Sequence, residues 1–167
     1  MPASPQSAAV KLSNRCHYAA LALFDIAFHS RGQATQVRQI AERQDIPVRF
    51  LEQIFQDLKR AELVDGRRGR NGGYFLRKPP ESITIGDIVR ATDGPLDLTF
   101  APDDALTESA PESRIASRSG REVPATVWTD IGQRVTAAFD AFTVADLVSR
   151  AEALRIQRDE PRLMYFI

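Results

Sequence analysis

Basic side chains are concentrated in one short stretch of this chain, residues 59–78. Within it, the segment 65–73 is rich in glycine as well as arginine, and short apolar segments flank it on both sides. A charge run is more commonly a solvated surface, but its position at a helix end and a glycine-rich turn favours an anionic partner. Clustered guanidinium groups bind phosphates and also suit the negative potential of a narrow DNA minor groove. The seven basic residues are Lys59, Arg60, Arg67, Arg68, Arg70, Arg77 and Lys78, against Glu62 and Asp65.

A second group of polar residues precedes this stretch. Segment 47–60 carries apolar residues at helical spacing, from Phe50 to Leu58, and polar residues on its other faces. A DNA major groove admits one α-helix, whose polar side chains can then reach base edges. The two groups together give the candidate DNA-binding residues: Arg49, Glu52, Gln53, Gln56, Lys59, Arg67, Arg68, Arg70 and Asn71.

Three predicted helices and a β-ribbon would position these residues. Ser13 can cap a first helix to about residue 29, and Thr35 can cap a short second helix. Asp45-Ile46-Pro47 indicates a turn, because the residue before proline avoids helical geometry, and Pro47 itself suits the first position of the third helix. Leu63-Val64 and segment 74–76 are typical of short strands around a turn. This order predicts a winged helix-turn-helix, followed by a helix that a capping box at Thr84 opens. The alternative for the same pattern is a helical bundle with a solvated loop.

The second part of the chain differs in composition. Residues 94–167 contain 8 Lys/Arg against 12 Asp/Glu, whereas residues 1–93 contain 14 against 10. We expect a loose tail (1–10), the winged helix-turn-helix domain (11–94), an acidic flexible loop (95–124), a dimerisation region (125–156) and a C-terminal tail (157–167). The fold class is therefore mainly α with a small two-stranded β wing and a long C-terminal dimerisation helix. The expected dimerisation stripe is Val127, Ile131, Val135, Ala138 and Phe142, at coiled-coil-like spacing.

Composition limits the alternatives. A chain of 167 residues that is 43% hydrophobic can form one ordinary domain with a real core. No apolar run approaches the roughly 20 residues of a membrane helix, and the start does not match a secretory signal, so we expect no membrane partner and a cytoplasmic protein. One cysteine excludes a disulfide framework within the chain and a zinc site built from several cysteines of one chain.

Specific residues then indicate a family. The run Leu51-Glu52-Gln53 followed by Arg68-Gly69 and by Gly72-Gly73-Tyr74 resembles the Rrf-two family of bacterial transcription regulators. The resemblance implies a homodimer on a double-stranded DNA operator, with the third helix in the major groove and the wing at the minor groove. It also implies that Glu52 and Gln53 are the recognition pair, that Arg68 is the wing arginine, and that the long helix pairs the subunits.

The resemblance also bears on cofactors. Many members of the family hold an iron–sulfur cluster through cysteines in the loop before the long helix, but here residues 97–124 contain no cysteine or histidine. We therefore expect no cofactor and a Cys16 that packs inward. A cluster shared by two subunits through Cys16 and His17, and a thiol that oxidises reversibly, remain as alternatives.

The C-terminal residues suggest a partner. Met164, Tyr165, Phe166 and Ile167 resemble the end of the cysteine-metabolism repressors in the cluster-free branch of the family. They also resemble the peptide with which serine acetyltransferase enters the active site of O-acetylserine thiol-lyase (cysteine synthase). The same residues could instead pack on their own domain.

These features predict a homodimeric DNA-binding regulator that represses genes of sulfur or cysteine metabolism. Its signal would come from a partner enzyme bound to the C-terminal tail. One alternative is a thiol-redox or iron–sulfur sensing regulator of the same family. Another is an interaction module that occupies an enzyme active site with its tail. We do not expect an enzyme, because neither of the two histidines, His17 and His29, has a nucleophile arranged with it.

Overall fold

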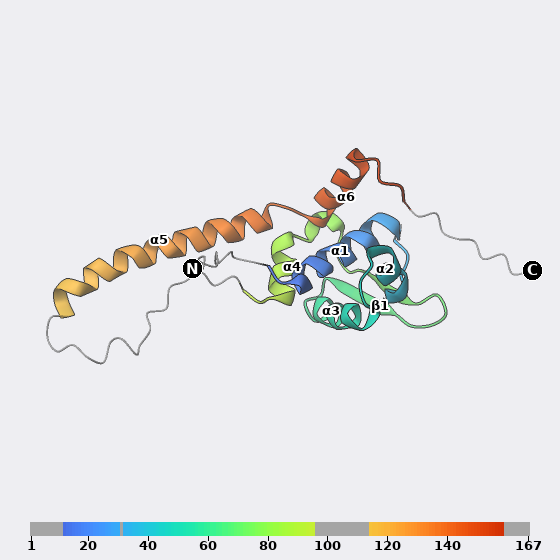
Figure 1. Ribbon diagram of the computed structural model, residues 1–167, viewed down its shortest axis with the longest axis horizontal. Helices are drawn as coiled ribbons and strands as arrows, with labels where there is room; N and C mark the ends of the chain where they lie inside the picture. Colours follow the sequence, from blue (N-terminus) through green and yellow to red (C-terminus); the bar gives the residue numbers. More distant parts are fainter. Residues whose placement is uncertain (1–11, 31, 96–113, 159–167) are drawn as a thin grey trace, which may run out of the picture.

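The computed structural model describes residues 12–30, 32–95 and 114–158, with the backbone alone for 114–125. Within these ranges the chain forms six α-helices, one short 3-10 helix and one antiparallel two-stranded sheet (Figure 1). This confirms the predicted mainly helical fold with a small β wing. The elements are α1 (Asn14–His29), α2 (Val37–Gln44), α3 (Val48–Arg60), β1 (Val64–Arg67), β2 (Gly73–Leu76), η1 (Pro80–Ser82), α4 (Ile85–Thr92), α5 (Arg114–Asp140) and α6 (Val144–Ala153).

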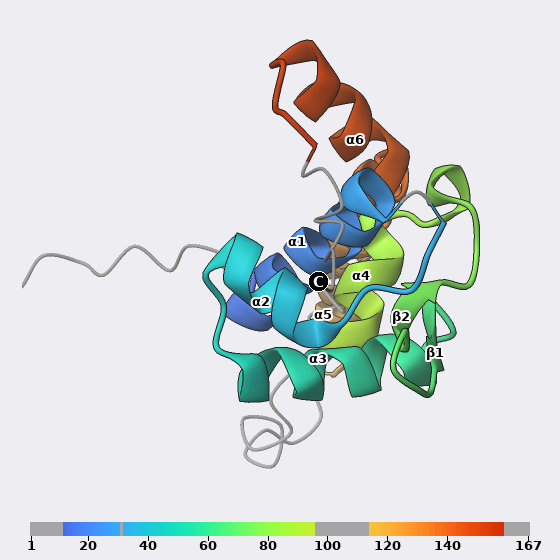
Figure 2. The same ribbon diagram turned by 90° about the vertical axis from the view of Figure 1, so that its right-hand side faces the viewer.

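Helix α1 is the centre of the core. Its residues Leu23 and Ile26 are fully or almost fully buried, and α2, α3, α4 and α6 all pack against it. Figure 2 shows α2, α3 and α4 grouped around it. Burial of aliphatic and aromatic side chains removes apolar surface from water and is the main force that holds these helices together. The core also includes Ile40, Leu51, Ile54, Phe55, Leu58, Leu63, Ile83, Ile88 and Val144.

A buried ion pair joins α1 to α2. Asp25 is fully buried, and its two carboxylate oxygens accept from Arg43 Nε at 2.9 Å and from an Arg43 terminal nitrogen at 2.6 Å. Gln44 Nε2 donates to the same carboxylate at 2.9 Å. A buried carboxylate needs partners of this kind, and their fixed geometry sets where α2 lies on α1.

Two helix starts agree with the sequence and one does not. Ser13 Oγ accepts from Cys16 N at 3.1 Å, and Thr84 and Asp87 form the expected capping box. The prediction that Thr35 caps α2 is wrong: Gln36 is the N-cap, in a capping box with Gln39. Thr35 is buried and its backbone pairs with Tyr74 instead.

The boundaries of α5 also differ from the expected ones. The helix begins at Arg114, so part of the expected loop 95–124 is helical, while residues 96–113 lie outside the described residues. The expected loop was assigned from the composition of residues 95–124 as a whole, although residues 114–123 taken alone are mostly acceptable helix formers. At the other end α5 stops at Asp140, so the expected long helix region 125–156 is divided into α5 and α6.

Helix α5 extends away from the rest of the molecule. In Figure 1 it is a long arm that joins the other helices at its C-terminal end, beside α4. Of the helices that the structure describes, none is long and apolar enough to cross a membrane.

Candidate nucleic-acid interface

Helix α3 presents two different faces. Leu51, Ile54, Phe55 and Leu58 are fully buried in the core. The predicted DNA-binding residues of this helix, which are Arg49, Glu52, Gln53, Gln56 and Lys59, are all exposed. Because the helical period places the buried residues on one side, the polar side chains share the solvent side of α3.

The wing follows α3 directly. Strands β1 and β2 pair antiparallel, with Val64 opposite Leu76 and Arg67 opposite Gly73. Figure 2 shows this ribbon beside one end of α3. The residues of the tip are exposed and include four of the predicted ones: Arg67, Arg68, Arg70 and Asn71. The structure therefore brings the helix set and the wing set next to each other.

Lys59 is engaged at the base of the wing. Its Nζ lies 3.3 Å from Asp65 Oδ1, and both side chains are about half exposed. The pKa of Asp65 is lowered, first by a hydrogen bond from the Gly66 backbone N–H and then by Lys59. Lys59 thus neutralises a carboxylate beside the basic tip, in addition to its predicted contact with DNA.

Two glycines allow the wing to be attached to the loop before α2. Tyr74 N donates to Thr35 O and Thr35 N donates to Tyr74 O, both at 2.8 Å. A Cβ on Gly73 would lie 2.3 Å from Thr35 O, and Gly73 has φ +148°, so another residue is excluded here. A Cβ on Gly72 would lie 2.4 Å from Arg67 O. These glycines serve the internal packing of the wing.

Aromatic stacking fixes the wing against α3. The rings of Phe55 and Tyr74 are stacked with centroids 4.3 Å apart. Phe55 is fully buried in α3, while Tyr74 is on β2. Helix and wing therefore hold a defined relative position, which a protein that reads two grooves of DNA needs.

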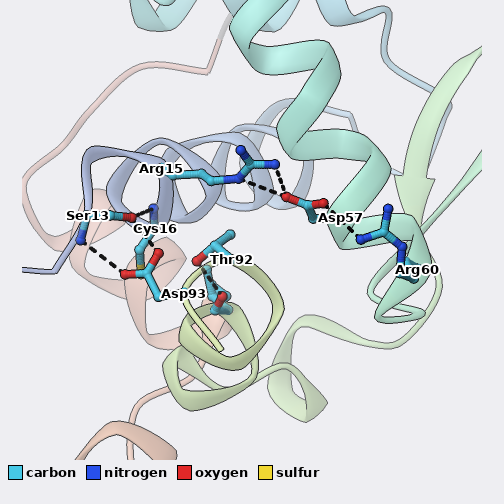
Figure 3. A network of polar contacts seen from close by, with 8 residues as sticks. Ser13, Arg15, Cys16, Asp57, Arg60, Thr92 and Asp93 are labelled. Carbon is cyan, nitrogen blue, oxygen red and sulfur yellow. Dashed lines mark hydrogen bonds and ion pairs between the residues drawn. The ribbon is translucent and has the colours of Figure 1, made fainter. Parts of the chain in front are cut away.

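Helix α3 is tied to α1 by a carboxylate that sequence reasoning missed. Asp57 accepts from Arg15 Nε at 2.8 Å, and an Arg15 terminal nitrogen contacts the same oxygen (Figure 3). Arg60 pairs with the other oxygen at 3.2 Å. No local sequence pattern predicts the contact between Arg15 and Asp57, since the two residues are 42 positions apart. Both residues help to hold the exposed polar face of α3 in place.

Cys16 is buried near the start of α1. Its backbone N–H donates to Ser13 Oγ, and Ser13 N donates to Asp93 Oδ2 at 3.1 Å (Figure 3). Burial raises the pKa of the Cys16 thiol, an effect that the Thr92 hydroxyl partly offsets and the Asp93 charge reinforces. Within the described ranges no group of three or more His, Cys, Asp or Glu side chains could hold a metal ion.

The predicted dimerisation residues lie in part on an exposed apolar face of α5. Val127 is 50% exposed, Ile131 38%, and the neighbouring Trp128 47%. Val135 is half-buried and Ala138 is exposed. Phe142 is not on α5: it follows the end of the helix, its carbonyl accepts from Ile85 N, and Arg150 lies over its ring. The helix ends two residues before Phe142, so the spacing pattern extended the stripe too far. The predicted partner-binding residues 164–167 lie outside the described residues.

Comparison with known proteins agrees with this arrangement. The model of the Rrf2 family, described as "Iron-dependent Transcriptional regulator", matches residues 12–150. The HTH-type transcriptional regulator IscR of Yersinia enterocolitica is 30% identical over 148 residues, which cover 88% of this chain and 84% of that protein. The structure of CymR, the global cysteine regulator of B. subtilis, is similar with a TM-score of 0.63 at 29% identity, over 84% of this chain and 98% of that one. T. potens IscR is similar with a TM-score of 0.66 at 30% identity, over 95% and 98%. A winged helix with an exposed polar α3, matched by this family over most of its length, means that the chain belongs to the Rrf2 family of transcriptional regulators.

Proposed function

We propose that this regulator binds a two-fold operator as a homodimer and represses genes of sulfur or cysteine metabolism. Helix α3 would lie in the major groove, with Glu52 and Gln53 at base edges, and the wing would reach the adjacent minor groove through Arg68. The observation that carries the proposal is the exposed polar face of α3 directly beside the exposed arginines of the wing.

The charges of these two surfaces suit separate tasks. Exposed arginines at the wing tip are suited to phosphates and to a narrow minor groove. The carboxylate of Glu52 can accept from cytosine N4 and would repel phosphates in a misdocked complex. A helix that reads bases next to a ribbon that holds the backbone gives both specificity and affinity.

The apolar face of α5 supports the dimer. Val127, Trp128 and Ile131 are large apolar side chains that are between a third and a half exposed. Such a row on one helix indicates a protein surface that covers it. A second copy of the same helix would cover both faces at once, because a two-fold axis repeats each contact.

We further propose that the signal arrives through an enzyme. A structural relative is named as a global cysteine regulator. The apolar C-terminal residues, 164–167, would enter the active site of O-acetylserine thiol-lyase, with the Ile167 carboxylate in place of the substrate carboxylate. The polar segment before them, which contains Pro161, would act as a spacer.

A direct sensor is the second candidate, since the sequence relatives are named IscR and the family is described as iron-dependent. The described residues do not fit an iron site: Cys16 is the single cysteine of the chain and is buried, and no group of three or more His, Cys, Asp or Glu side chains among them could hold a metal ion. Reconstitution with iron and sulfide without oxygen should therefore leave the protein colourless. A stoichiometric cluster that disappears in Cys16→Ser would favour the sensor instead.

Selection from a random duplex library tests DNA binding. The purified dimer should enrich a symmetric site and protect it from nuclease. A protein that enriches no sequence, and protects none, would be an interaction module without regulatory DNA binding.

Calorimetry with O-acetylserine thiol-lyase tests the partner. The full-length protein should bind, deletion of Ile167 should abolish the heat, and O-acetylserine should compete. Equal heats from the two proteins would reject insertion of the tail, and a lower melting temperature on deletion would indicate that the tail packs on its own domain.

A further inference from the structure

The junction of α4 and α5 contains a cluster of polar side chains that no part of the proposed function uses. Asp140, the last residue of α5, accepts from Thr84 Oγ1 at 3.1 Å and from two Arg90 nitrogens at 2.8 and 3.3 Å. Thr84 and Arg90 belong to the two ends of α4, and Arg90 also pairs with Asp87 at 2.9 Å. One carboxylate therefore ties the end of the long arm to both ends of α4.

Gly86 makes this contact possible. A Cβ at Gly86 would lie 1.9 Å from Asp140 Oδ1 and 2.9 Å from Asp140 Cγ. Gly86 is buried in the first turn of α4, where no turn or positive φ requires glycine. Glycine costs about 1 kcal/mol relative to alanine inside a helix, so its presence here is explained by the space that the carboxylate needs.

The cluster lies beside the joint between α5 and α6, where the backbone forms a short antiparallel pairing with the residues that lead into α4. Ile85 N donates to Phe142 O at 2.8 Å and Val144 N donates to Ile83 O at 2.9 Å, so residues 142–144 pair with residues 83–85. This pairing holds the start of α6 in the core. The direction of α5 depends on its packing against α4, to which Phe139, packed on the core, and Asp140, bonded to α4, contribute at the last turn.

The length of α5 makes this direction important. The helix has 27 residues and is thus about 40 Å long, so a rotation of about 10° at its C-terminal end moves its far end by about 7 Å. If two α5 helices pair, an equivalent rotation displaces each α3 along the DNA by several ångströms. One base pair corresponds to about 3.4 Å.

We propose that Asp140, seated against Gly86, is a positioning residue that fixes the angle between α5 and the winged helix and thereby sets the half-site spacing that the dimer accepts. The inference rests on the proposed binding of a dimer to a two-fold operator. It assigns spacing to this junction and base readout to α3.

The test selects operators from random duplex DNA with the full-length parent and with Asp140→Ala. The parent should enrich two half-sites at one spacing. Asp140→Ala should enrich the same half-site sequence at several spacings, and its loss of affinity for the parent's spacing should exceed tenfold, with less than a threefold loss at the best alternative spacing. Gly86→Ala puts a methyl group where the Asp140 carboxylate lies, so it should cause the same broadening. It serves as the second variant if Asp140→Ala does not fold.

Asp146→Ala is the matched control. Asp146 accepts from Thr143 N at 2.7 Å and from Thr143 Oγ1 at 2.9 Å, on the α6 side of the same joint. Its replacement should lower the melting temperature and keep the single spacing. If Asp140→Ala and Gly86→Ala both keep the parent's single spacing, the proposal is wrong while operator binding stands. A parent that enriches no sequence overturns both.

A measurement without DNA gives a second readout. Spin labels at Gln56→Cys, in a Cys16→Ser background, report the distance between the two α3 helices of a dimer. The distribution should be narrow with Asp140 present and clearly broader with Asp140→Ala. Equal widths would contradict the proposal.

Discussion

Asp57 and Asp140 do similar work at two places in the molecule. Each carboxylate accepts from an arginine on another helix, Arg15 for Asp57 and Arg90 for Asp140. A charge-assisted hydrogen bond of this kind is directional, so it fixes an angle as well as a distance. At the residue scale, single acidic side chains position both the polar face of α3 and the helix α5.

Arg68 is the residue at which DNA binding is most directly tested. Its exposed position at the wing tip allows a contact with a base edge or a narrow minor groove. Arg68→Ala should weaken operator binding by about 1–3 kcal/mol, measured by titration at one fixed salt concentration. Arg77→Ala is the control, because Arg77 already pairs with Glu62 at 3.1 Å. An unchanged affinity for Arg68→Ala would show that the wing does not read this operator.

The pKa shifts at the α4–α5 junction give a prediction about acid. The Arg90 hydrogen bond lowers the pKa of Asp140; the pKa of Asp87 is also lowered, since burial that would raise it is outweighed by bonds from Arg90 and Thr84. A carboxyl group with a lowered folded pKa stabilises the fold above its ordinary pKa of about 4 and loses this contribution as the pH falls through the folded value. The melting temperature should therefore decrease as the pH is lowered beneath about 4. Asp140→Asn should flatten this dependence, and equal slopes for the two proteins would contradict it.

At the element scale, local signals were predictable and tertiary ones were not. The amphipathic period of α3 and the capping residues Ser13 and Thr84 depend on neighbours in sequence, so the sequence predicted them. Thr35 has a capping side chain, but its backbone pairs with Tyr74, and no local pattern reveals a partner so far along the chain. The same reason explains why the contacts of Asp57 and Asp140 were missed. The early start of α5 was missed because composition was averaged over too long a segment.

The attachment of the wing should depend on Gly73. Gly73→Ala would place a methyl group against Thr35 O and force alanine into a φ of +148°, at a cost of about 2 kcal/mol or more. Denaturant unfolding should show this loss, and operator affinity should fall because the wing is no longer held. Gly66→Ala provides the comparison, since its nearest contact would be Tyr74 at an ordinary 3.7 Å. Equal stability of the two variants would mean that the Thr35–Tyr74 pairing does not hold the wing.

At the scale of the whole molecule, the polar face of α3 and the apolar face of α5 lie in different parts of the structure. The polar face of α3 belongs to the compact part, and the exposed apolar residues of α5 lie along the arm (Figure 1). The family could be predicted from the sequence because specific residues carry the resemblance, and the two helix faces could be predicted because each rests on a helical period. The angle between them could not, because it depends on the junction where Gly86 and Asp140 meet.

The dimer should depend on the centre of the α5 face. Ile131 is 38% exposed and lies one helical turn from Val127 and from Val135, so an aspartate there would place an unpaired carboxylate in the seam of both subunits. Ile131→Asp should weaken the dimer by about 3 kcal/mol or more, which is a hundredfold or greater rise in Kd. Light scattering should then find a monomer at micromolar concentration, with the helical content retained. Leu154→Asp is the control: Leu154 is 75% exposed but follows α6, away from α5, and its replacement should leave the dimer intact. A dimer that survives Ile131→Asp and dissociates with Leu154→Asp would move the interface from α5 to the end of α6.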